Sequence, residues 1–98
     1  MEMLDKVEMK GTVGHVLTTP MMHGKEVRFS LATQHGIDTK WHDCVAFTES
    51  TPSAGELKKG DKVHLLGRIK MERYLRPGGC MVALPKVHVN TLEILRTI

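Results

Sequence analysis

The residues with the clearest chemical potential lie between positions 58 and 76. This segment carries seven lysines and arginines but only two carboxylates, a net charge of +5 in a chain whose total is +3. Two-residue alternation along a strand would place Arg68, Lys70, Glu72 and Tyr74 on one face. Cations neutralise phosphates, and an exposed ring stacks an unpaired base for roughly 1–3 kcal/mol. The pattern predicts a surface for single-stranded nucleic acid, although charged outer positions are also ordinary in a half-exposed sheet.

Aromatic residues are few, and their positions bear directly on this prediction. The chain has two phenylalanines, Phe29 and Phe47, one tryptophan, Trp41, and one tyrosine, Tyr74. Trp41 and Phe47 share one parity of the segment 40–48, so they would lie on the same face of a strand. Residue types alone favour a core over a stacking platform for such a pair.

Other chemistry is weakly indicated. His42 and Cys44 share a strand parity, but no third group is placed to orient them as a nucleophile pair. The six histidines are scattered without the spacing of metal ligands. Cys44 and Cys80 form no CxxC motif, which favours two reduced thiols over a zinc site or a disulfide. We therefore expect no enzymatic activity, no metal and no cofactor.

Length and composition describe the framework that must position these residues. A chain of 98 residues, 41% hydrophobic and 26% charged, is typical of one soluble domain, here 1–98. No apolar stretch reaches the roughly 18 residues of a membrane span, and residues 1–10 lack the layout of a secretory signal. We expect a cytoplasmic protein.

Period-two alternation recurs along the chain, whereas no long stretch has helical periodicity. Gly11 and Gly14 interrupt the first alternating segment, which predicts a strand bent by a bulge. Pro85 interrupts the last segment and marks an edge or a bulge. A short helix is predicted within 53–59 at most, and the predicted strands cover about 6–17, 27–31, 40–48, 62–75 and 81–94.

This element order indicates an all-β fold. Five strands, with a short helical or irregular link between the third and the fourth, match the OB-fold, a five-stranded Greek-key barrel. Alternation alone leaves an SH3-like barrel or a small sandwich open.

Several short motifs occur in an order that resembles bacterial single-stranded DNA-binding proteins. The third predicted strand reads Trp-His-Asp-Cys-Val-Ala-Phe over 41–47, similar to the tryptophan-histidine and phenylalanine pattern of that family. It is preceded by Leu-Ala-Thr at 31–33 and followed by Leu-Lys-Lys-Gly at 57–60. A valine strand with Gly-Arg at 63–68 and a charged segment ending in an aromatic at 70–74 complete the order. Each motif alone is weak, and their order carries the resemblance.

The resemblance covers about residues 5–95. It implies an OB-fold that binds single-stranded DNA without strong sequence preference, in DNA replication, recombination or repair. It also implies a homodimer or homotetramer, with His42 at a contact between subunits. Carried over by position, it makes stacking platforms of Trp41, Phe47 and Tyr74 and places near phosphates Lys62, Arg68, Lys70, Arg73 and Arg76.

The sequence departs from the family pattern at three points. Residues 34–39 form a shorter loop than is common, without the additional aromatic often found near its start. Asp43 stands where a basic or neutral residue is usual and would repel phosphate if it faced the binding groove. The sequence has no glycine- and proline-rich extension with an acidic tip, so recruitment of protein partners through such a tail is not expected.

A short chain without this tail resembles members encoded by mobile elements, or the primosomal replication protein. The departures leave two alternatives open. One is an OB-fold protein-interaction subunit of the primosomal kind that has lost nucleic-acid binding. The other is a single-stranded RNA binder, because base stacking and phosphate neutralisation do not read the 2′-hydroxyl.

Overall fold

Strands make up nearly all of residues 6–96, the part of the chain that the computed structural model describes. Residues 1–5 and 97–98 of the predicted domain lie outside the described residues. The predicted short helix between the third and fourth strands is a single 3-10 turn, η2 (Pro52–Glu56). The strands are β1 (Lys6–Pro20), β2 (Lys25–His35), β3 (Asp38–Phe47), β4 (Lys62–Leu75) and β5 (Met81–Leu95).

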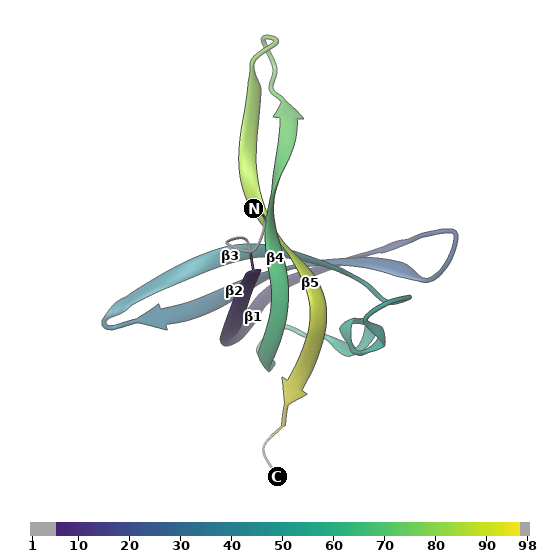
Figure 1. Ribbon diagram of the computed structural model, residues 1–98, viewed down its shortest axis with the longest axis vertical. Coiled ribbons are helices and arrows are strands. Elements are labelled where there is room, and N and C mark those ends of the chain that lie inside the picture. Colours follow the sequence, from purple (N-terminus) through teal and green to yellow (C-terminus); the bar gives the residue numbers. More distant parts are fainter. Residues whose placement is uncertain (1–5, 97–98) are drawn as a thin grey trace.

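The strands close into a barrel in the order β1-β2-β3-β5-β4. β3 and β5 run parallel, and every other neighbouring pair is antiparallel. This is an OB-fold, so the predicted class is confirmed. Three hairpins extend from the barrel, and the β4–β5 hairpin is the one at the top of Figure 1. We call residues 70–86 of this hairpin the arm.

β1 pairs with two neighbouring strands because it bends. Its first half pairs with β4 and its second half with β2, and the β1–β2 register shifts between Val13 and Val16. The backbone N–H of His15 within this bulge donates to Ser30 Oγ at 2.9 Å. The predicted bulge in the first strand is therefore confirmed. It lets one strand close the barrel on both sides.

The irregularity of the last strand lies elsewhere than at Pro85. Pro85 pairs with Met71 in the arm, where β5 has β4 as its neighbour and an open edge on the other side. The missing N–H of proline is tolerated on such an edge, so of the two predicted roles the edge is correct. The bulge of this hairpin lies at Asn90, which the register skips between Leu66↔Thr91 and Gly67↔Val89.

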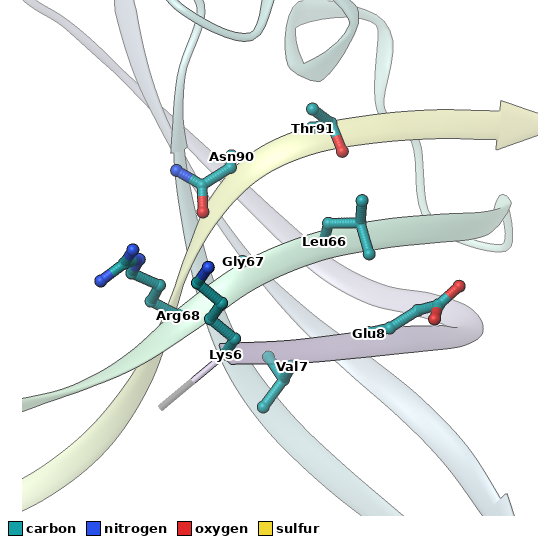
Figure 2. Close-up of a pocket in the computed structure, with 8 residues that line it drawn as sticks. All are labelled: Lys6, Val7, Glu8, Leu66, Gly67, Arg68, Asn90 and Thr91. Carbon is teal, nitrogen blue, oxygen red and sulfur yellow. The ribbon is translucent and has the colours of Figure 1, made fainter. Parts of the chain in front are cut away.

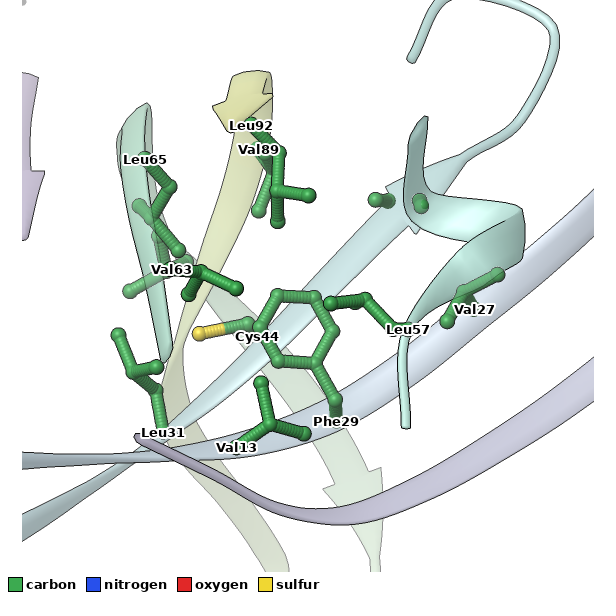
Figure 3. Packing of buried hydrophobic residues seen from close by; sticks show 13 residues of the cluster. Val13, Val27, Phe29, Leu31, Cys44, Leu57, Val63, Leu65, Val89 and Leu92 are labelled. Carbon is green, nitrogen blue, oxygen red and sulfur yellow. The ribbon is translucent and has the colours of Figure 1, made fainter. Parts of the chain in front are cut away.

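The core fills the barrel from all five strands, and Figure 3 shows Phe29 and Cys44 packed near its centre. Phe29 is 4% exposed and is the one aromatic residue in the cluster of buried residues. Aliphatic side chains of moderate size surround it, which suits the narrow interior of a five-stranded barrel. They are Val13, Val27, Leu31, Ala46, Ala54, Leu57, Val63, Leu65, Val87, Val89 and Leu92.

The two cysteines should differ sharply in reactivity. Cys44 is buried in the core, and burial is the largest cause that raises the pKa of its thiol to about 12. Cys80 is exposed at the start of the last strand. Because the thiolate is the reactive form, we expect one thiol to react rapidly with a disulfide reagent near pH 8, and two after denaturation. Cys80→Ser should abolish the rapid reaction, and a rapid reaction that survives in this variant would contradict the placement of Cys44.

Candidate nucleic-acid interface

The outer face of β3 carries the aromatic residues singled out in the sequence. Alternation directs Cys44 and Ala46 into the core, whereas Trp41 and Phe47 point outward. Trp41 is 61% exposed and Phe47 is 38% exposed. The interpretation of this pair as core residues, drawn from residue types alone, is therefore wrong. Both rings are open to a ligand.

Trp41 lies against β1 because glycine occupies the facing position. A Cβ atom built on Gly14 would lie 2.6 Å from Cζ3 of the indole, so any larger residue would displace the ring. Gly14 thus leaves room for the indole at the β1 bulge. A hollow of about 250 Å³ adjoins the ring and is lined by Trp41, His42, Asp43, Ile69, Leu84, Pro85 and Val87.

A second hollow of about 230 Å³ extends the same face toward β1 and β2, and Asp43 lines both hollows. The Asp43 carboxylate lies 3.5 Å from Lys86 Nζ. Asp43 therefore faces the groove, which is the placement expected to repel phosphate, but Lys86 offsets its charge. The local field on phosphate is weaker than an isolated carboxylate would produce.

Tyr74 reaches this face from the arm. Its hydroxyl donates to Glu72 Oε1 at 2.6 Å, and Lys86 Nζ lies 5.7 Å from the ring centroid. The ring is 37% exposed. A third aromatic thus lies beside the Lys86–Asp43 pair. Lys86 contacts both the Tyr74 ring on the arm and Asp43 on β3.

Glu72 has partners on three strands. Besides Tyr74, its carboxylate lies 3.5 Å from Arg28 on β2 and 3.6 Å from His88 on β5. The Tyr74 hydrogen bond is the largest cause that lowers the pKa of Glu72, and burial is the largest cause that lowers the pKa of His88.

Sequence reasoning missed Arg28, Lys86 and His88, because they lie outside the basic segment 58–76. Their outward parity within alternating segments is the one signal that pointed to them.

The cations expected near phosphates are spread over several surfaces. Lys70 pairs directly with Lys86 at the base of the arm, beside the aromatic face. Arg73 lies on the opposite face of the arm from Tyr74, and Arg76 lies in the turn at its tip. Lys62 begins β4, where its Nζ lies 3.3 Å from the hydroxyl of Thr12. The structure thus brings Lys70 to the aromatics but not the other three.

Arg68 lines a different hollow, of about 510 Å³, over β1, β4 and β5. Figure 2 shows Lys6, Arg68 and Asn90 grouped at one end of it, with Glu8 and Thr91 toward the other. In the β4–β5 register Arg68 is nevertheless paired with His88, the residue of β5 that contacts Glu72 on the aromatic face. It lies at the boundary between the two surfaces.

His42, expected at a subunit contact, takes part in a hydrogen-bonded row within the chain. The Thr33 hydroxyl lies 2.9 Å from Nε2 of His42 and 3.0 Å from Nε2 of His35. One hydroxyl can donate to one ring and accept from the other while both rings are neutral. Burial, followed by the nearby charges of His35 and Lys40, lowers the pKa of His42 from its ordinary value of 6.5.

This row predicts a loss of stability in acid. Below pH 6.5 the unfolded chain takes up a proton at His42 that the folded chain resists, so the free energy of unfolding falls as the pH falls. His42→Gln should reduce this dependence between about pH 7.5 and pH 5.5 in chemical denaturation experiments, leaving the part due to His88, whose pKa burial also lowers. His23→Gln, in the exposed β1–β2 turn, should leave it unchanged. Equal slopes for His42→Gln and the wild type would contradict this role.

Residues 6–96 contain neither a metal-binding cluster nor a membrane-spanning helix. No group of three or more histidine, cysteine, aspartate or glutamate side chains there could hold a metal ion. No helix in the same range is long and apolar enough to cross a membrane.

Known proteins are similar to the chain in sequence pattern and in fold. The model of the single-strand binding protein family matches residues 4–95. A Plasmodium falciparum SSB solved in complex with ssDNA is 20% identical, with a TM-score of 0.78 over 98% of both chains. A mitochondrial single-stranded DNA-binding protein of S. cerevisiae is 18% identical, with a TM-score of 0.70 over 93% of this chain and 94% of that one. No curated protein matches the chain. At these identities the solved structures support the fold.

Proposed function

Since the chain belongs to the single-strand binding protein family, we propose that it binds single-stranded DNA along the outer face of β2, β3 and β5 and the base of the arm. The observation that carries this proposal is Trp41, a large ring 61% exposed beside a hollow. An exposed indole is costly to leave in water and is well suited to stacking an unpaired base. Binding of this kind requires no catalytic group.

In this proposal the bases stack on Trp41, Phe47 and Tyr74. Their rings point outward on β3 and on the arm, and every base presents a face that can stack on them. Binding therefore tolerates any sequence, as suits a role in DNA replication, recombination or repair. The phosphates are neutralised by Lys70 and Lys86 beside the rings and by Arg68 at the boundary of the face. Lys62, Arg73 and Arg76 lie on other surfaces and contribute only where the strand continues beyond the rings.

The carboxylates on this face moderate the affinity. Asp43 and Glu72 each lie within 4 Å of a cation, so a phosphate must compete with them for Lys86 and Arg28. Both ion pairs are long and each has one partly exposed partner, so they contribute little and can be exchanged for a phosphate. We therefore propose binding that is strongly salt-dependent and of moderate affinity. The two carboxylates should speed the dissociation of the strand.

We further propose that the protein works as a homodimer or homotetramer. His42 lies on β3 within reach of the chain's own Thr33 hydroxyl, and a subunit contact there would cover a row of polar groups that already satisfy one another. Light scattering should give the mass of two or four chains. The mass of one chain would contradict this assembly.

The function is tested by the anisotropy of fluorescently labelled strands. We expect oligo(dT) to bind with an affinity that falls linearly on a log–log plot against salt, with a slope of about −0.7 for each phosphate neutralised. A duplex of the same length should compete poorly, because its bases cannot stack on the rings. Oligo(rU) tests the RNA alternative, and tighter binding of RNA would replace DNA as the ligand. Flat anisotropy with every strand would leave the protein-interaction alternative.

A further inference from the structure

Glu72 links the arm to the barrel through side chains on three strands. Its Oε1 accepts the Tyr74 hydroxyl at 2.6 Å and lies 3.5 Å from Arg28 on β2. Its Oε2 lies 3.6 Å from Nε2 of His88 on β5. A single carboxylate therefore meets an aromatic of the arm and two basic groups of the barrel.

The bond to the phenol is the strongest of these contacts. It is short and charge-assisted, which makes it about twice as strong as a neutral hydrogen bond. The contact with Arg28 is long, and the arginine side chain is 38% exposed, so it contributes little by itself. The main effect of Glu72 is therefore on the position of Tyr74, because the contacts with Arg28 and His88 are long and the His88 Nε2 makes no hydrogen bond within residues 6–96.

The Tyr74 ring is held from two sides. Glu72 fixes its hydroxyl, while Lys86 lies 5.7 Å from the ring centroid and 3.5 Å from Asp43 on β3. A ring on a projecting hairpin would otherwise lose rotational freedom when a base stacks on it. A ring that is already fixed avoids much of this cost, which is the general advantage of preorganisation.

We propose that Glu72 is a positioning residue, which orients the Tyr74 ring for base stacking by accepting the phenol hydrogen bond. This inference rests on the proposed function, since it concerns a ring that we place in the DNA-binding face. It gives an acidic residue on that face a favourable role. From charge alone, the opposite is expected, because a carboxylate repels phosphate.

A double-mutant cycle separates the two roles. The variants are Tyr74→Phe, which keeps the ring and removes the hydroxyl, Glu72→Gln, and the double variant, each titrated with labelled oligo(dT). Loss of negative charge acts equally in the tyrosine and phenylalanine backgrounds, so it cancels in the cycle. We expect Tyr74→Phe to bind roughly 2- to 12-fold more weakly, because only part of the strength of this hydrogen bond is expressed as stacking affinity. Glu72→Gln should cost correspondingly more affinity with tyrosine present than with phenylalanine.

The salt dependence separates an effect on stacking from an effect on charge, because its slope reports the number of phosphates neutralised. Tyr74→Phe changes no charge, so its binding should weaken with an unchanged slope against salt. Glu93→Gln makes the same change of charge on the exposed β1–β4–β5 face and should show no coupling to Tyr74. Thermal melts should show all four variants folded, because the changes are conservative and lie at the surface.

The possible outcomes distinguish failure of the positioning role from failure of the proposed DNA binding. A Tyr74→Ala variant that binds weakly, together with wild-type affinity for Tyr74→Phe and no coupling to Glu72, would overturn the positioning role alone. Wild-type affinity for Tyr74→Ala would remove Tyr74 from the binding face and overturn the inference with it. A wild-type protein that binds no oligo(dT) would overturn both.

Discussion

Trp41→Ala is expected to weaken the binding of oligo(dT) by about 1–3 kcal/mol, or roughly 5- to 150-fold in Kd. The ring is 61% exposed and is not part of the core cluster. Its removal should therefore change the free energy of unfolding by less than about 1 kcal/mol. Titration of labelled DNA measures the first effect, and chemical denaturation measures the second.

The matched control for this change is Ile37→Ala. Ile37 is 97% exposed in the β2–β3 turn, so the substitution also removes a large apolar surface residue. It should leave both affinity and stability close to those of the wild type. If Trp41→Ala unfolds the protein, the indole has a structural role that its exposure does not indicate. If it folds and binds normally, the stacking face lies elsewhere.

Among the substitutions considered, Gly11→Ala is expected to lower the free energy of unfolding most, by about 3 kcal/mol or more. Gly11 lies in β1 where the strand passes from β4 to β2, and a Cβ atom there would overlap the backbone carbonyl of Ala32. Backbone cannot move aside as the end of a side chain can, so β1 and β2 would have to separate. Thermal or chemical denaturation should detect a much less stable barrel.

Gly55→Ala is the control for this substitution. A Cβ atom on Gly55, in η2, would meet only Thr48 Cγ2 at 3.5 Å, an ordinary contact distance. Its stability should stay within about 0.5 kcal/mol of the wild type. If Gly11→Ala were equally harmless, the close approach of β1 to β2 at this position would be contradicted.

Much of the fold could be predicted because a strand's period of two is readable in the sequence. The bend at the glycines of β1 and the short link between the third and fourth strands both follow from residue types with strong backbone preferences. The position of the last bulge could not be predicted. Asn90 does not adopt the left-handed backbone that asparagine often marks, whereas Pro85 lacks a backbone donor and therefore attracted the prediction.

The orientation of Trp41 was harder to predict from residue types. Val45 shares its parity yet is 1% exposed, so this strand face is open at Trp41 and Phe47 and covered between them. Val45 pairs with Arg28 on one side and with His88 on the other, and it lies outside the core cluster. Alternation identifies which residues share a face, but what covers that face depends on side chains from other strands.

The contacts of Glu72 were beyond prediction for a related reason. The sum of charges over 58–76 identified a basic segment, but Arg28 and Lys86 come from strands far away in the sequence. They meet Glu72 and Asp43 only because β2, β3 and β5 lie side by side and the arm extends from β4 and β5. The segment's cations, in turn, are divided among several surfaces. Charge counted along the chain therefore overstates how many cations lie near the stacking rings.

The most direct test of the account is the fluorescence of Trp41 during a titration with oligo(dT) at several salt concentrations. Trp41 is the one tryptophan in the sequence, so its emission reports on this face alone. We predict quenching that saturates with DNA and a Kd that rises steeply with salt, as expected for a stacked base and several neutralised phosphates. Unchanged emission, although labelled DNA is bound by the same sample, would place the strand away from Trp41 and contradict the proposed face.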